Sequence, residues 1–252
     1  MKPARITVLL TFLLLLLCNC SRDSEPEVEQ ECQIDISIYD YTFGINHDDP
    51  GPFLIPGEQS NLTPFYRQEI REAVGDPEDS IVYILKLCDW VNQNFTFENA
   101  GGGMIGIPTV NELFEAKTFY GCHSEALLIS SIIRAFGFPA VMIETADVQW
   151  AYDYHEGRTE SFAGHVMSEI LVEGKWILLD NNGSYVEEYD PRDPFISTRF
   201  PSRGLFVFAK GIDTWDYSGR DENFTYDKLI FFSDNIYCFE EMFNTNDYDW
   251  KP

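Results

Sequence analysis

The chain has 252 residues, of which 44% are hydrophobic and 15% aromatic. This length fits one domain with additions, and the apolar content is sufficient for a core of its own. The formal net charge of -25 at pH 7 argues against binding to nucleic acid, which needs basic clusters, and against electrostatic docking on anionic lipid.

The first 20 residues are typical of a targeting segment. Lys2 and Arg5 precede an apolar stretch at residues 6–17. That stretch is too short to span a bilayer and suits the hydrophobic part of a signal sequence. We therefore expect the protein to be exported.

Residues 17–21 (LCNCS) resemble the signal of bacterial lipoproteins. The resemblance implies that Cys20 is lipidated and becomes the mature N-terminus. Attachment to the membrane would then be through this lipid only, in the periplasm or at the cell surface. The alternative is a plain secretory signal with two incidental cysteines. Residues 21–31 are polar and acidic, and we expect them to form a tether.

Four cysteines follow the lipoprotein-like signal: Cys32, Cys88, Cys122 and Cys238. An exported protein tolerates disulfides, and if Cys122 stays free for chemistry at most one pair forms. Cys32 with Cys238 would join the two ends of the mature chain, but the pairing remains open. Cys88 lies on an apolar helical face and is expected to be a buried core thiol.

The first half of the chain predicts an irregular region followed by helices. Residues 32–75 are expected to be an N-terminal extension, because turn-forming residues are frequent in it. A helix is predicted over residues 76–94, where apolar residues recur at helical spacing after an acidic first turn. Residues 100–104 (AGGGM) predict a flexible loop.

A helix that begins at Cys122 is the strongest element of the sequence. Apolar residues cover most of its circumference as far as Phe136, which predicts a buried central helix. Gly137 is a natural stop, and residues 140–143 predict a strand. Residues 145–162 are polar and aromatic without a clear period, and we expect a long loop that borders a cleft.

Cys122 stands where a nucleophile would be activated. A free thiol titrates near about 8.5, and the unpaired N–H groups and dipole of a helix N-terminus favour the thiolate. The same N–H groups could hold a developing oxyanion. His165 and Asp180 follow later in the chain, so the order is that of a cysteine nucleophile, its base and an orienting carboxylate.

A predicted hairpin supports this grouping. The apolar runs at residues 165–172 and 175–180 are separated by Glu173-Gly174, a two-residue turn. With that turn the side chains of His165, Met167 and Asp180 share one face, and His165 and Asp180 are diagonal neighbours. Taken singly, each polar residue is more simply structural, but the order and register together favour a triad.

Two other kinds of site are not favoured. His123 follows Cys122, but adjacent residues on a helix point apart, so we do not expect it to belong to the site. No ligand pair has the spacing of a zinc finger or of an HExxH motif, so neither a metal nor another cofactor is expected.

Part of the sequence resembles the transglutaminase-like superfamily, a branch of the papain-like cysteine fold. The resemblance is carried by Gly121-Cys122 with its apolar helix, residues 134–140 (RAFGFPA), His165 with Glu169, and Gly174-x-Trp176-x-x-x-Asp180. It implies that Cys122 is the nucleophile, His165 the general base and acid, and Asp180 the orienting group.

The sequence departs from the family pattern at two positions. Met167 stands where an aromatic residue is frequent, and Asn181 stands where proline is frequent. Both departures bear on substrate shape more than on the triad. An oxyanion donor is not clearly matched, and Tyr120 is the candidate.

The resemblance implies an α+β fold in which a central helix bearing the cysteine packs on an antiparallel sheet. The core is expected at residues 76–185. A C-terminal extension at residues 186–252 is expected to complete the sheet with strands at 205–208 and 229–232.

The expected function is that of an exported cysteine-dependent enzyme acting on amide bonds through a thioester. Hydrolysis of a peptide, protein or glycopeptide is favoured over crosslinking, because water outcompetes an amine unless the site excludes it. The alternative is a non-catalytic binding or scaffold protein on the same fold. The sequence leaves the substrate and the oligomeric state open.

Overall fold

The structure is a computed structural model. The described residues are 44–99, 104, 106–155, 157, 164–181, 183, 185–193, 195–196, 204–217 and 222–234. The expected signal segment with Cys20, the acidic tether, Cys32, Cys238 and most of the loop at 100–104 lie outside these residues. Among the helices of the described part, none is both long and apolar enough to cross a membrane.

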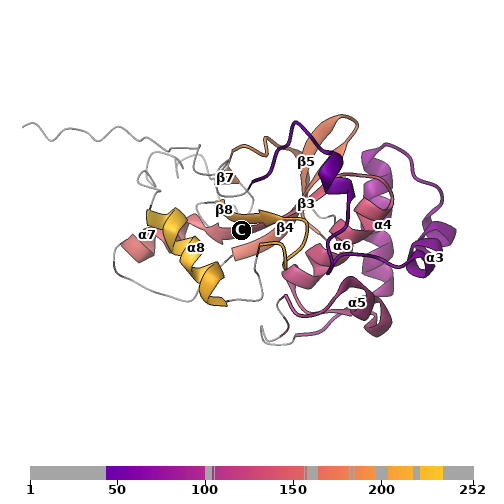
Figure 1. Ribbon diagram of the computed structural model, residues 1–252, viewed down its shortest axis with the longest axis horizontal. Helices are drawn as coiled ribbons and strands as arrows, with labels where there is room; N and C mark the ends of the chain where they lie inside the picture. The colour runs from indigo at the N-terminus through magenta and orange to yellow at the C-terminus, as the bar shows by residue number, and fades with distance from the viewer. Residues whose placement is uncertain are drawn as a thin grey trace, which may run out of the picture. The chain divides into compact units, whose positions relative to one another are not determined.

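An antiparallel sheet forms the centre of the fold. Its strands follow the order β6-β5-β4-β3-β8-β7, and every neighbouring pair is antiparallel (Figure 1). The strands are β3 (Ala140–Asp147), β4 (Gly164–Val172), β5 (Lys175–Leu179), β6 (Val186–Glu188), β7 (Phe195–Ile196) and β8 (Leu205–Gly211).

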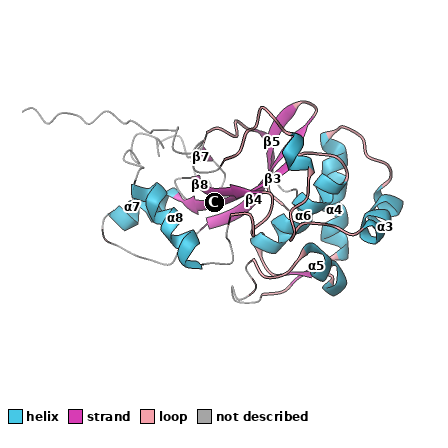
Figure 2. Cartoon of the chain, viewed as in Figure 1, coloured by secondary structure: helices cyan, strands magenta, loops and turns pink. Residues whose placement is uncertain are grey.

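Helices pack around this sheet, as Figure 2 shows. They are η1 (Gly51–Leu54), α3 (Pro64–Val74), α4 (Ile81–Asn94), α5 (Val110–Ala116), α6 (Cys122–Ala135), α7 (Val148–His155) and α8 (Glu222–Asp234). A small parallel sheet pairs β1 (Thr96–Phe97) with β2 (Thr118–Phe119).

The central helix is α6, and it begins at Cys122 as the sequence predicts. It packs against β3 and β4 on one side and against α4 and α5 on the other. A hydrogen bond of 2.8 Å between Ser130 and Ser168 joins α6 to β4 within the buried layer. The α+β fold, with the cysteine-bearing helix on an antiparallel sheet, is therefore confirmed.

The sheet carries a core on each face. The larger core lies between the sheet and the helices and includes Leu127, Ile132 and Ile170. A smaller core on the opposite face includes Phe53 and Met167. Both faces of the central strands are thus buried, which accounts for their nearly continuous apolar runs.

The predicted β4–β5 hairpin is confirmed. Val172 pairs with Lys175, as the sequence predicts, and the ladder continues to Ser168 opposite Leu179. Glu173 and Gly174 have φ angles of 52° and 74°. Two successive positive values are typical of the type I′ turn that matches the twist of a hairpin.

Two regions expected to be irregular contain helices. The N-terminal extension contains α3, which begins with Pro64 and buries Ile70. The loop expected at residues 145–162 is wrong in its first part, because β3 continues to Asp147 and α7 follows directly. In α7 the buried residues Val148 and Ala151 are three apart, a helical spacing that aromatic neighbours obscure.

The strand expected at residues 229–232 is also wrong, because these residues belong to α8. Leu229 and Phe232 are buried while Phe231 is exposed, which is a helical rather than an alternating pattern. Residues 186–252 contribute β6, β7 and β8 to the six-stranded sheet.

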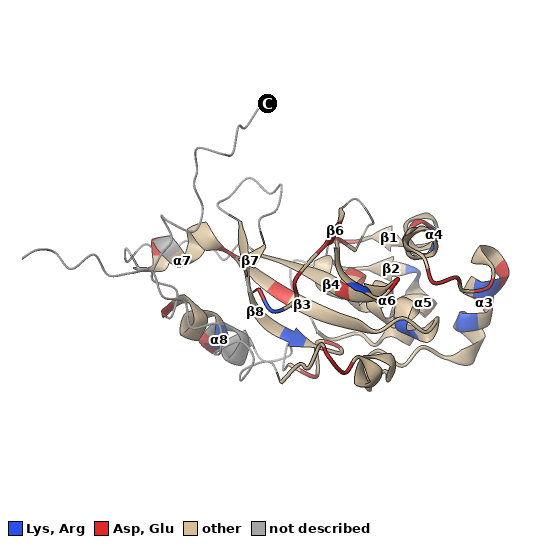
Figure 3. Cartoon of the chain, turned by 90° about the horizontal axis from the view of Figure 1, so that it is seen from above, with Lys and Arg blue, Asp and Glu red and all other residues tan. Residues whose placement is uncertain are grey.

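Charged residues lie on separate elements around this fold. Figure 3 shows basic residues on α3, β8 and α8, apart from one another in the described chain. Acidic residues lie on α3 and α8 as well, and on the loops.

Candidate active site

Cys122 is the first residue of α6 and is half-buried. The chain reaches it from β2, and Gly121 turns it into the helix with a φ of 128°. The N–H of Tyr120 donates to Ser124 Oγ at 2.6 Å, and Ser124 Oγ donates to the carbonyl of Gly121 at 3.3 Å. This small network fixes the backbone on both sides of the sulfur.

His165 and Asp180 are in contact. Nε2 of His165 lies 3.0 Å from Oδ1 of Asp180. His165 is the second residue of β4, and Thr145 of β3 grips its backbone on both sides, donating to its carbonyl at 2.8 Å and accepting from its N–H at 3.3 Å. The imidazole therefore projects from a strand end held by its neighbour.

Asp180 lies directly after β5, in a turn held by backbone hydrogen bonds. Its N–H donates to the carbonyl of Tyr185 at 2.9 Å, and its carbonyl accepts from Gly183 at 2.7 Å. The next residue, Asn181, is fully buried, donates to the carbonyl of Val166 at 2.6 Å and accepts from Ser168 at 3.0 Å. Asn181 thus ties the aspartate turn to the histidine strand.

Sequence reasoning missed this role of Asn181. It treated the residue only as a departure from the family pattern and as turn chemistry. A buried amide that bridges two strands needs a partner on each, and the predicted pairing did place Asn181 beside Val166. The hairpin register was the signal that could have found it.

The His165 ring favours the thiolate form of Cys122. Burial raises the pKa of Cys122, but the hydrogen bond with His165, the charges of His123 and His165, and the Val166 N–H together lower this pKa below its ordinary value. Because Asp180 holds Nε2, Nδ1 is the ring nitrogen left to share a proton with the sulfur.

The His165 ring favours its protonated form. Burial lowers its pKa, but hydrogen bonds to Asp180 and Cys122 and the charges of both partners raise it to about 9. A thiol with a lowered pKa beside an imidazole with a raised pKa favours the thiolate–imidazolium pair. This pair is the reactive form of a cysteine nucleophile.

His123 acts on the Cys122 thiol through its charge, an effect that the sequence argument did not consider. Its side chain does turn away from that of Cys122, and its Nε2 lies 3.3 Å from Oε1 of Glu144 on β3. Its charge nevertheless lowers the pKa of the Cys122 thiol. The expectation that His123 does not belong to the site is therefore wrong in one respect, because its charge acts on the nucleophile. Glu144, an acid in the buried part of β3, was the missed signal.

Other candidate groups differ in their surroundings. Cys88 is buried as expected, and burial raises its pKa to about 12, so it stays a thiol. Glu125 lies one helical turn after Cys122, and burial followed by the charge of Asp180 raises its pKa to about 7. The ring of Tyr120 packs partly against the core, and its role as an oxyanion donor stays a prediction.

Within the described chain, no group of three or more His, Cys, Asp and Glu side chains could hold a metal ion.

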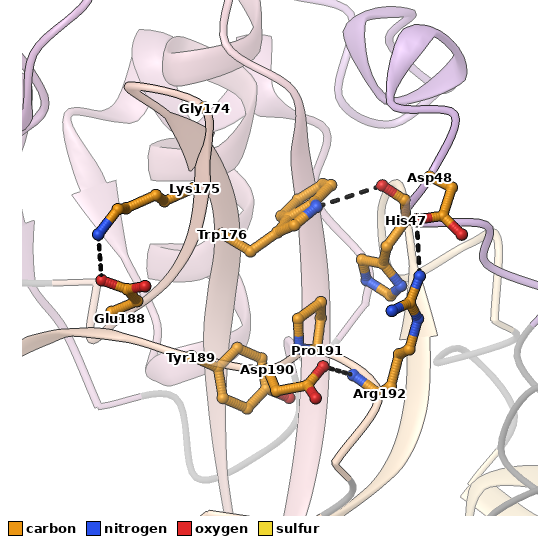
Figure 4. A pocket seen from close by; sticks show the side chains of 10 residues that line it. All are labelled: His47, Asp48, Gly174, Lys175, Trp176, Glu188, Tyr189, Asp190, Pro191 and Arg192. Carbon is orange, nitrogen blue, oxygen red and sulfur yellow. Dashed lines mark hydrogen bonds and ion pairs between the residues drawn. The ribbon is translucent and has the colours of Figure 1, made fainter.

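A pocket of about 480 Å³ lies away from Cys122, between the β4–β5 turn, the segment after β6 and the segment around His47 (Figure 4). Ion pairs cross its rim, Lys175 with Glu188 at 2.6 Å and Arg192 with Asp48 at 2.6 Å. None of its lining residues belongs to the Cys122 site.

Comparison with known proteins gives structural likeness only. No family model and no curated protein matches the sequence. A protein from Cytophaga hutchinsonii, provisionally named a cysteine protease, has a TM-score of 0.48 and 18% identity over 69% of this chain and 50% of that chain. A structure named as a TGase has a TM-score of 0.36 and 13% identity over 71% of this chain and 52% of that chain. The chain spans about half the length of each, and we assign no activity from either.

Proposed function

We propose that the protein is a cysteine-dependent enzyme that cleaves amide bonds, with Cys122 as nucleophile, His165 as general base and acid, and Asp180 as orienting group. The observation that carries the proposal is the contact of 3.0 Å between His165 and Asp180, beside a thiol whose pKa the same ring lowers. Because Cys122 is the first residue of α6, the helix dipole also favours its thiolate.

Acylation would begin from the thiolate–imidazolium pair. The sulfur attacks the carbonyl carbon of the substrate, and the new oxyanion faces the N–H groups of the first turn of α6. His165 then donates its proton to the leaving nitrogen, the carbon–nitrogen bond breaks, and a thioester remains on Cys122. Asp180 keeps the ring oriented and stabilises its charged form.

Deacylation would use the same groups in reverse. The neutral His165 takes a proton from water as the water oxygen attacks the thioester carbon. The carbon–sulfur bond breaks, the electron pair stays on the sulfur, and the thiolate–imidazolium pair is restored. An amine in place of water would give transamidation, and we propose hydrolysis as the main reaction because the site is only partly buried.

The place of action follows from the N-terminal sequence. A signal segment that ends at Cys20 supports a lipid-anchored protein in the periplasm or at the cell surface. The substrates available there include peptides, proteins and glycopeptides, and we propose this class as the target. The strongly acidic chain disfavours nucleic acid as a partner.

Alkylation followed by peptide mapping tests the nucleophile. At about pH 6 iodoacetamide should modify Cys122 faster than free cysteine, because a lowered pKa leaves more thiolate. Cys122→Ala should abolish hydrolysis of a peptide library, whereas Cys88→Ala, which changes a buried and inert thiol, should retain it.

The opposite outcome would favour a binding protein. If Cys122 reacts no faster than free cysteine and Cys122→Ala releases the same products as the unchanged protein, the enzyme proposal is wrong. Retained binding of a library peptide by both forms, without turnover by either, would point to the non-catalytic alternative.

A further inference from the structure

A buried polar cluster lies behind the nucleophile, formed by His123 of α6, Glu144 of β3 and Tyr217 after β8. The side chains of His123 and Glu144 are 13% and 5% exposed, and Tyr217 is buried. Nδ1 of His123, Oε2 of Glu144 and the hydroxyl of Tyr217 have no hydrogen-bond partner among the described residues. The one contact that joins the cluster is the 3.3 Å approach of His123 to Glu144.

The same chain contains a second buried histidine–carboxylate pair, which serves as a comparison. His47 Nε2 lies 2.8 Å from Oε2 of Glu169, and the other oxygen of Glu169 accepts from Tyr189 at 3.0 Å and from Lys210. Both carboxylate oxygens of that pair are therefore partnered, whereas Oε2 of Glu144 is not. Buried polar groups in folded proteins are nearly always satisfied, because an unmet one costs about 1–3 kcal/mol. The incomplete pair beside Cys122 therefore calls for a role other than holding the fold.

We propose that His123, held by Glu144, is a positioning residue of the nucleophile: it keeps a positive charge beside the Cys122 sulfur that does not take part in proton transfer. The inference rests on the proposed function of Cys122. It assigns the pair of His123 and Glu144 to the electrostatics of the same site, not to the packing of α6 on β3.

The charge of His123 would add to that of His165 when the sulfur leaves. Once His165 has given its proton to the leaving amine, its ring is neutral. In deacylation His165 regains a proton from water, the carbon–sulfur bond breaks, and the sulfur leaves with the electron pair. His123 is turned away from the proton path, so its charge is present throughout and favours the sulfur as a leaving thiolate.

The electrostatic surroundings support this role. Burial lowers the pKa of His123, but the hydrogen bond and charge of Glu144, followed by the charge of Cys122, raise it above its ordinary value. The titratable groups that face this pair are Cys122 on α6, His165 on β4, Tyr217 after β8 and Lys228 on α8, with Asp213 and Asp216 acting on the last two. Tyr217 has a raised pKa and stays neutral.

The test is the alkylation rate of Cys122 as a function of pH in His123→Gln, Glu144→Gln and the double variant, with iodoacetamide as the probe. Loss of the charge should move the profile to higher pH and slow alkylation at about pH 6 by about three- to tenfold, since a higher pKa leaves less thiolate but makes it more nucleophilic. The double variant should be no slower than the slower single variant, because both act through one charge.

His47→Gln is the matched control, since it breaks the other buried pair on the opposite face of the sheet. It should lower the melting temperature and leave the alkylation profile unchanged. A folded His123→Gln protein with the unchanged protein's profile would overturn the inference. So would an NMR titration of the unaltered protein in which the His123 ring is neutral at pH 7, a result that needs no variant to fold. Slow alkylation of the unaltered protein would instead contradict the proposed function.

Discussion

The charge on the Cys122 sulfur results from effects of opposite sign. Burial favours the neutral thiol, and the partners around it favour the thiolate by more. The same opposition applies to His165, whose partners outweigh burial and raise its pKa to about 9. Each residue is thus stabilised in its charged form by the other, so a change at either is expected to shift both.

The pH dependence of hydrolysis should follow from this pair. Activity should fall as pH rises through about 9, where His165 loses the proton it must donate. In Asp180→Asn the loss of the carboxylate charge should move this fall to lower pH and reduce kcat/KM on the order of a hundredfold. Initial rates across pH with one peptide substrate measure both effects. An alkaline limb unchanged in Asp180→Asn would mean that Asp180 does not support the charge of His165.

At this scale the sequence predicted the contact of His165 with Asp180 but not the way His165 reaches Cys122. Alternation along β4 would place His165 with Met167, which packs in the core on the face away from α6. Among the described residues the β4–β5 ladder ends at Ser168, so β5 does not pair alongside His165, although β3 still does through Thr145. The point at which the β4–β5 ladder stops cannot be read from residue types. The sequence therefore did not predict how the His165 side chain reaches Cys122.

At the scale of the elements, the direction in which α6 begins depends on the residue before it, Gly121. Gly121 has a φ of 128°, a conformation that other residues rarely adopt, and it aims the first turn of the helix from β2. The buried face of α6 then fixes its direction against β3 and β4. The position of the sulfur is therefore set by one backbone angle and a packed helix.

Gly121→Ala and Gly174→Ala form a matched pair of variants. Both glycines have a positive φ, and an added Cβ at either would meet open space. Each change should lower the free energy of unfolding by about 1 kcal/mol through backbone strain alone. Only Gly121→Ala should also slow alkylation of Cys122, as measured at equal folded fraction. Equal alkylation in the two variants would show that the angle at Gly121 does not position the sulfur.

Some elements could be predicted from the sequence and others could not. The β4–β5 hairpin follows from two local signals, a two-residue turn and apolar runs of matching length. The helices α7 and α8 carry no comparable signal, because they pack on each other and on β3 and β8. Their helical state is stabilised by contacts between segments far apart in the chain, which local propensity does not report.

At the scale of the whole molecule, a histidine–carboxylate pair outside the triad lies on each face of the sheet. His123 with Glu144 lies on the α6 face, and His47 with Glu169 lies on the other. Glu169 also meets Lys210 and Tyr189, so it joins β4, β8 and the segment after β6. We interpret this second cluster as a structural centre of the fold. The three partners of Glu169 are distant from it in sequence, so only the folded chain reveals them.

Glu169→Gln should therefore destabilise the fold by roughly 3–5 kcal/mol, because Lys210 would keep a buried charge without its partner. Burial raises the pKa of Glu169, but Lys210 and His47 lower it below the ordinary 4.5. A lowered folded pKa means that this stabilisation is present above the unfolded value and is lost as pH falls through the folded one. Urea unfolding at neutral and acidic pH measures both.

Glu188→Gln provides the control, because its ion pair with Lys175 is exposed and screened by solvent. It should leave the midpoint of urea unfolding nearly unchanged. If both variants lose the same stability, the buried cluster has no special part in holding the sheet.

The sheet ends in short strands on both sides. In the described part of the chain, β6 has 3 residues and β7 has 2, whereas the central β4 has 9. Short edges present few unpaired N–H and C=O groups to a neighbouring molecule, and long flat edges are the usual template for aggregation. A protein crowded at high density on a surface would benefit, because its copies could collide repeatedly without adding strands to one another.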